Sequence, residues 1–148
     1  MVTQGIFQRK ERGLVRGRTI SGMVTAAIYI ACREIGTPRI LKEIAANSNT
    51  KRKNIAQCYR LLISELDLIV HMADPMKCIV KIENKAELLE KITRLALNMM
   101  TEIINSKISA GKNPMSFAAT VLYISSFKAG EKITQLDIAN AAGVTEIT

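Results

Sequence analysis

Two short basic segments stand where the sequence predicts that helices begin. "VRGR" at 15–18 precedes one helix, and "TKRK" at 50–53 places three cations in the first turn of another. The positive end of the helix dipole disfavours cations there unless an anion lies nearby. A glycine beside a cation also lets the backbone approach a phosphate oxygen closely. Both segments therefore predict contact with phosphate. For 50–53 an acidic protein patch is an equal option, and for both a solvent-exposed basic face is the alternative.

The distribution of charge agrees with a polyanionic partner. Residues 1–60 carry a net charge of +9 and residues 61–148 carry −1, within a formal total of +8. A basic excess concentrated in one half of a chain is the pattern expected when one surface faces nucleic acid. A basic surface with no such partner is the alternative that charge alone leaves open.

Other chemistry finds little support in the residues. His71 has no nucleophile or ligand near it in sequence, and the three cysteines form no Cys-x-x-Cys pair. We therefore expect no enzyme, no metal site and no cofactor, and we interpret Cys32, Cys58 and Cys78 as reduced, mostly buried small side chains. The sequence has neither a run of about 18 apolar residues nor a signal-peptide core, which predicts an intracellular protein without a membrane span.

Helical spacing of apolar residues predicts an all-α fold. From the N-cap Thr19, one helix runs toward Gly36 with a stripe of Ile20, Met23, Val24, Ala27, Ile28 and Ala31. A short helix follows Pro38, and a longer one starts near Lys51. After a linker, a short helix near 76–83 and a longer one over about 88–103 are expected. Asn113 and Pro114 then cap and open another helix.

An internal repeat organises these helices. Residues 17–54 align without a gap on residues 111–148, at a constant offset of 94. Gly17-Arg18 matches Gly111-Lys112, and "EIA" at 43–45 matches "DIA" at 137–139. Each copy holds a short helix, a turn and the start of a second helix, which is helix-turn-helix spacing. Gly143 would adopt a left-handed backbone at one turn, and its counterpart Asn49 is the next most tolerant residue.

The stretches "GLVRGRTISGMVTAAIYIACREIGTPRILKEIA", "YRLLISELDL", "GKNPMSFAATVLYIS" and "TQLDIANAAGVTEIT" resemble the core of the archaeal transcription factor B family, the counterpart of eukaryotic transcription factor IIB. The resemblance covers nearly the whole chain in order. It implies two tandem cyclin-like repeats of five helices each, over 1–70 and 77–148, joined by a linker at 71–76. It also implies a monomer that binds the TATA-binding protein on bent promoter DNA and helps recruit RNA polymerase. The implied location is the archaeal cytoplasm, at the nucleoid, or the nucleus if the source is eukaryotic.

In that family the last helix of the second repeat reads the B recognition element in the major groove. Ile147 and Thr148 match the start of the reading stretch, and Thr145 is placed to cap its helix. The rest of that helix would follow residue 148, and the zinc ribbon, polymerase linker and first helix would precede residue 1, so we expect both repeats to be incomplete. We also expect Val121, Leu122 and Ile138 to be uncovered. The family usually has a capping residue at position 51, so the cap of that helix is expected to shift to Thr50.

The candidate DNA-binding residues are Arg16, Gly17, Arg18, Lys51, Arg52, Lys53, Gly111, Lys112, Thr145, Ile147 and Thr148. For 50–53, an acidic patch on the TATA-binding protein is the protein-side option. Two other functions fit a pair of such helical units. One is a cyclin-box protein-interaction module without DNA binding. The other is a helix-turn-helix regulator that would dimerise on a palindrome, although the in-register repeat favours one pseudo-symmetric monomer.

Overall fold

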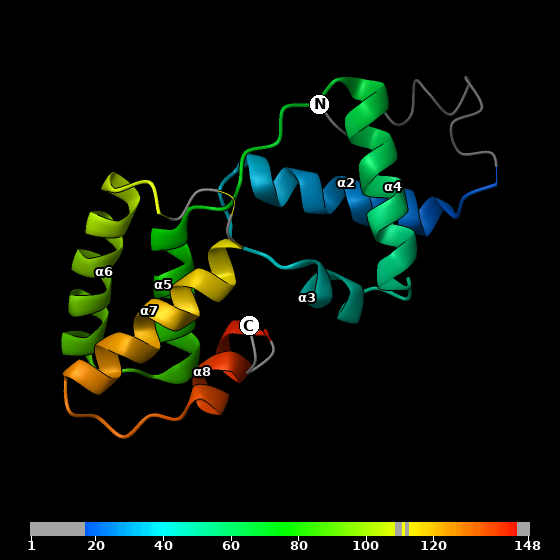
Figure 1. The fold of residues 1–148 in the computed structure, drawn as a ribbon. Coiled ribbons are helices and arrows are strands. Elements are labelled where there is room, and N and C mark those ends of the chain that lie inside the picture. Colours follow the sequence, from blue (N-terminus) through cyan, green and yellow to red (C-terminus); the bar gives the residue numbers. More distant parts are fainter. Residues whose placement is uncertain (1–16, 109–110, 112, 145–148) are drawn as a thin grey trace. The chain divides into compact units, whose positions relative to one another are not determined.

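The computed structural model describes residues 17–108, 111 and 113–144, and these residues form helices with no strand among them. The predicted all-α class is confirmed. The helices are α2 (Ile20–Glu34), α3 (Leu41–Ala46), α4 (Arg52–Leu66), α5 (Pro75–Ala86), α6 (Glu90–Asn105), α7 (Pro114–Lys128) and α8 (Gln135–Ala142), all labelled in Figure 1. The chain divides into two compact units between Met72 and Ala73, called here unit 1 and unit 2.

In unit 1, α2 and α4 pack on each other, and α3 packs on both (Figure 1). Ser21 and Thr50 tie the start of α2 to the residues before α4, with their hydroxyl oxygens 2.8 Å apart. The rings of Tyr29 and Tyr59 meet between the two helices at 5.2 Å. The buried core of this unit consists of Met23, Ala26, Ala27, Ile30, Ile55, Cys58 and Leu62.

The buried face of α2 differs from the predicted stripe. Met23 and Ala27 are buried as expected, but Ile20, Val24 and Ile28 are exposed, at 61%, 41% and 53%. The row that faces α4 continues instead through Ala26 and Ile30, both fully buried. The prediction selected one apolar stripe, whereas α2 is apolar on two sides and the described residues of unit 1 cover only one of them.

In unit 2, helices α5, α6 and α8 all pack on α7, and α5 also packs on α6 and α8 (Figure 1). The α5 helix begins at Pro75, one residue before its predicted start, because the Asp74 side chain accepts a hydrogen bond from Met76 N (2.9 Å) and proline at the first position needs no donor. The buried side chains include Cys78, Ile79, Ile82, Ile92, Ala96, Met100, Met115, Ala118, Val121, Leu122 and Ile138.

The two units repeat the same local design. Helices α2 and α7 begin and end at positions 94 residues apart, and α3 and α8 begin 94 apart. Thr19 and Asn113, at equivalent positions, both cap their helices through a side-chain oxygen. Glu43 accepts a hydrogen bond from Ile40 N (3.3 Å), and its equivalent Asp137 accepts one from Thr134 N (3.2 Å). The shared caps fix the same helix starts in both units.

Unit 2 has an uncovered face, but not the one expected. Val121, Leu122 and Ile138 are all buried, so the expectation that they would be uncovered is wrong. Ile124 and Phe127 of α7 are the exposed ones, at 40% and 77%. Ile124 is the counterpart of Ile30, which faces α4 in unit 1. The described part of unit 2 has no helix in the place of α4.

The two helix-turn-helix turns use different backbone conformations. Gly143 has a φ of 69° at the end of α8, as predicted. Asn49 is not left-handed, since the positive φ values of described non-glycine residues fall at Asp67, Glu87 and Lys107. The reason is that α3 ends earlier, at Ala46. Its last carbonyls accept hydrogen bonds from backbone and side-chain groups of Asn47 and Ser48 in a right-handed tail.

Candidate nucleic-acid interface

The first turn of α4 presents cations with no acidic residue beside them in that turn. Lys51 is the N-cap and its side chain makes no capping bond, while Arg52 and Lys53 follow as exposed helix residues. The expected cap at Thr50 is wrong, because Lys51 is the N-cap. The Thr50 hydroxyl instead shares a hydrogen bond with the Ser21 hydroxyl, and Thr50 is buried. The α4 dipole therefore adds positive potential to three cationic residues.

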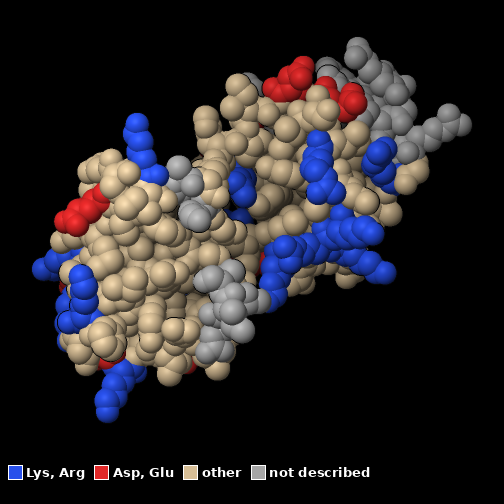
Figure 2. Space-filling view, in the orientation of Figure 1, with Lys and Arg blue, Asp and Glu red and all other residues tan. Residues whose placement is uncertain are grey.

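The charges of unit 1 are segregated along α4. Figure 2 shows basic side chains gathered over α3 and the start of α4, and acidic side chains at the far end of α4. The sequence explains this pattern, since Arg52 and Lys53 open the helix whereas Glu65 and Asp67 lie at its end. A surface of this kind attracts a polyanion in a defined orientation.

A basic pocket lies between the turn before α2 and the middle of α4. Its volume is about 620 Å³, and the described residues that line it are Gly17, Arg18, Gln57, Arg60 and Leu61. Gly17 has a φ of 78°, a left-handed backbone conformation that residues other than glycine rarely adopt. Its counterpart Gly111 has a φ of 74°, so the matched glycines share one backbone conformation as well as one place in the repeat.

Sequence reasoning missed Gln57 and Arg60. The available signal was helical spacing, since Lys53, Gln57 and Arg60 stand at positions i, i+4 and i+7 and share one face of α4. The structure brings Gly17 and Arg18 together with Gln57 and Arg60 around one hollow. The two pairs are at least 39 positions apart in the sequence. The predicted residues Arg16, Lys112, Thr145, Ile147 and Thr148 lie outside the described residues.

Cys58 lies beneath the same region. Burial raises the pKa of the Cys58 thiol, and the nearby Arg18 guanidinium opposes this by favouring the thiolate. The thiol nevertheless stays protonated at neutral pH because the net shift is upward. Cys58 and Cys78 are buried and Cys32 is half-buried, and none of the three forms a disulfide.

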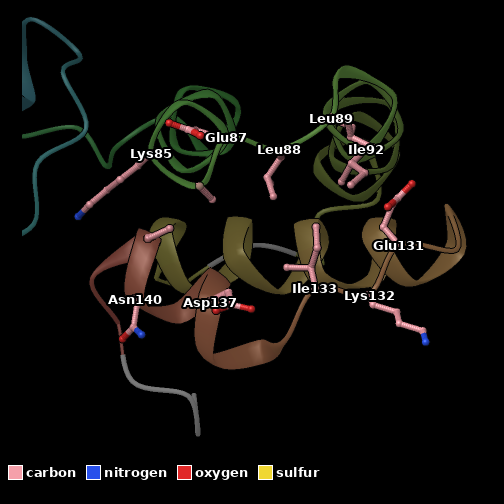
Figure 3. Close-up of a pocket in the computed structure, with 12 residues that line it drawn as sticks. Lys85, Glu87, Leu88, Leu89, Ile92, Glu131, Lys132, Ile133, Asp137 and Asn140 are labelled. Carbon is pink, nitrogen blue, oxygen red and sulfur yellow. The ribbon is translucent and has the colours of Figure 1, made fainter.

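A second hollow, of about 570 Å³, lies in unit 2 and has a different character. Figure 3 shows Leu88 and Ile133 turned toward each other across it, with Lys85 and Lys132 directed outward at its edge. The acidic lining residues Glu87, Glu131 and Asp137 offset these two lysines. Its apolar interior and mixed rim contrast with the pocket of unit 1, where both charged residues in the described lining are arginines.

Within the ranges that the structure describes, no group of three or more His, Cys, Asp or Glu side chains gathers as metal ligands. No helix in those ranges is both long enough and apolar enough to cross a bilayer.

The model of the family described as "Transcription factor TFIIB repeat" matches residues 4–65 and again residues 70–148. This chain belongs to the TFIIB repeat family. The family consists of transcription factors, not enzymes, so the TFIIB assignment confirms the predicted family and excludes the enzyme class. The two matched stretches also agree with the internal repeat and with its cyclin-like helical fold.

Curated proteins similar to this chain include three named "Transcription initiation factor IIB". The protein of Ignicoccus hospitalis is 47% identical over 138 residues, which cover 93% of this chain and 44% of that protein. The protein of Saccharolobus shibatae is 44% identical, with 93% and 45% covered. The protein of Pyrodictium occultum is 40% identical over 141 residues, with 95% and 46% covered. This TFIIB-family chain thus spans less than half the length of these archaeal relatives.

Proposed function

We propose that this chain acts in a general transcription initiation factor that binds the TATA-binding protein on promoter DNA, contacts the B recognition element and helps recruit RNA polymerase. The role needs no cofactor within residues 1–148, and the active form is a monomer that works inside the cell. One pseudo-symmetric monomer would act on each promoter complex.

The observation that carries this proposal is the basic start of α4. Arg52 and Lys53 stand in the first turn of a 15-residue helix that has no acidic residue there. A helix that is stable on its own normally places acidic residues at this end. Cations in their place favour a role that depends on an anionic partner, and promoter DNA in complex with the TATA-binding protein supplies one.

Joining a preformed complex is the direct test. A labelled promoter duplex is saturated with TATA-binding protein from a related archaeon, and this chain is then titrated while mobility in a native gel is followed. We expect a slower-migrating ternary complex that depends on both the TATA box and the TATA-binding protein. Scrambling the B recognition element in a second duplex measures base preference. No ternary complex at any concentration would refute the proposal.

The same titration separates the two other candidate functions. A protein-interaction module without DNA binding would bind the TATA-binding protein equally well with and without DNA, and salt would have little effect. A dimeric regulator would bind a palindromic duplex without the TATA-binding protein and would show two copies per duplex by light scattering. The in-register repeat favours one copy per promoter.

A further inference from the structure

The pocket of unit 1 extends the basic start of α4 along one face of the helix. Lys53, Gln57 and Arg60 share that face, and the rise from Lys53 to Arg60 is about 10.5 Å. Gly17 and Arg18 close the pocket from the turn before α2. Gln57 and Arg60 are exposed, and Arg60 forms no ion pair with any described residue. The pocket therefore offers donors from two separate elements.

We propose that Gln57 and Arg60, together with Gly17 and Arg18, bind one phosphate group of the DNA backbone. The inference rests on the proposed function and names two binding residues for it. Guanidinium groups present N–H donors in a geometry that matches phosphate oxygens, and an amide adds a further donor. A Cβ added at Gly17 would meet no atom within 4 Å, so the space in front of this residue is open to a ligand.

The lining favours a phosphate over an acidic protein segment. The cores of protein interfaces are rich in aromatic and large apolar side chains. Among the described residues that line this pocket, Leu61 is the one apolar side chain and none is aromatic. Arg18 also interacts with other groups of the chain, Cys58 among them.

The test measures salt dependence on a labelled duplex of non-promoter sequence, without the TATA-binding protein. The slope of log affinity against log salt decreases by about 0.9 for each phosphate that the protein no longer neutralises. We expect the double variant Arg18→Gln, Arg60→Gln to neutralise one phosphate fewer than the wild type. Its affinity should then fall about 3.5-fold less than that of the wild type between roughly 50 and 200 mM salt.

The matched control is Lys77→Gln, Lys128→Gln, which removes the same charge from exposed positions of unit 2, outside the basic surface of α3 and α4. Its slope should stay at the wild-type value. Equal slope changes in the two double variants would reduce the effect to net charge and overturn the proposal. A decrease of about 1.8 would mean two separate phosphates, and no decrease would mean none; either result overturns it.

Arg60 alone provides a variant that does not disturb the fold, because it is exposed and makes no ion pair with a described residue. Arg60→Gln should weaken duplex binding at a fixed low salt concentration, and Arg60→Lys should recover the slope but only part of the affinity, since an ammonium cannot form the paired contact. Wild-type affinity in both would overturn the proposal. Failure of the ternary complex with a normal duplex result would instead count against the proposed function alone.

Discussion

The double substitution Arg52→Gln, Lys53→Gln should make the protein more stable and its binding to promoter complexes weaker. A cation in the first turn of a helix opposes the dipole by about 0.3–1 kcal/mol at low ionic strength. Arg52 and Lys53 have no acidic neighbour in that turn, so removing both charges should raise the unfolding free energy of unit 1 by about 0.6–2 kcal/mol. Glutamine has nearly the same helix propensity as lysine and arginine, so propensity does not confuse the result.

Urea denaturation followed by circular dichroism measures stability, and titration of the TATA-binding protein–promoter complex at several salt concentrations measures binding. The slope of log affinity against log salt should decrease by about 1.8 if each side chain contacts a phosphate. Lys128→Gln is the matched control, because Lys128 lies in the last turn of α7, where a cation is favourable. It should lower stability and leave the slope unchanged. Unchanged affinity together with an unchanged slope in the double variant would refute our reasoning and assign both residues to a solvated face.

Two further predictions concern the caps and the close packing of the helices. Gly22→Ala should destabilise unit 1 by about 1–3 kcal/mol despite the better helix propensity of alanine. The cause is crowding, because the new Cβ would lie 2.9 Å from Thr19 Oγ1 and 3.3 Å from Cys58 Sγ. Thermal unfolding measures the change, and a variant as stable as the wild type or more stable would contradict this prediction. Hydrogen bonds from Thr134 lower the pKa of Asp137 below its ordinary 3.8, so the Asp137 carboxylate stabilises α8 above that pH and the contribution disappears as the pH falls through the lowered value. The stability difference between wild type and Asp137→Asn should therefore shrink in acid, and a difference independent of pH would exclude this cap as its source.

Local signals in the sequence predicted helix starts well. Thr19 and Asn113 were recognised as caps, and the offset of 94 placed α2 and α7 in the same register. These features depend on hydrogen bonds between a few adjacent residues, and such local bonds need no contact with distant parts of the fold. The left-handed Gly143 followed from the same kind of local rule.

Features that depend on packing were predicted poorly. Periodicity alone could not decide which apolar side of α2 meets α4, and it selected Val24 and Ile28, which are exposed. Thr50 looked like a cap in sequence, but its hydroxyl is taken by Ser21, 29 positions away. Arg60 was not predicted as a site residue because its neighbour in the pocket, Arg18, is distant in the chain. Arg18 and Arg60 come together only because the turn before α2 packs beside α4.

The matching helices α2 and α7 expose different faces. Val24 and Ile28 are exposed in unit 1, while their equivalents Ala118 and Leu122 are fully buried in unit 2, where α5 and α6 also pack on the shared central helix. Conversely, the side of α2 that packs on α4 corresponds to a side of α7 that is exposed at Ile124. Among the described residues, each central helix thus has neighbours for which the other has no counterpart. Because the central helices match in register, recombination between the two gene segments would exchange whole helices without an insertion or deletion, while the buried face of the central helix would still have to change.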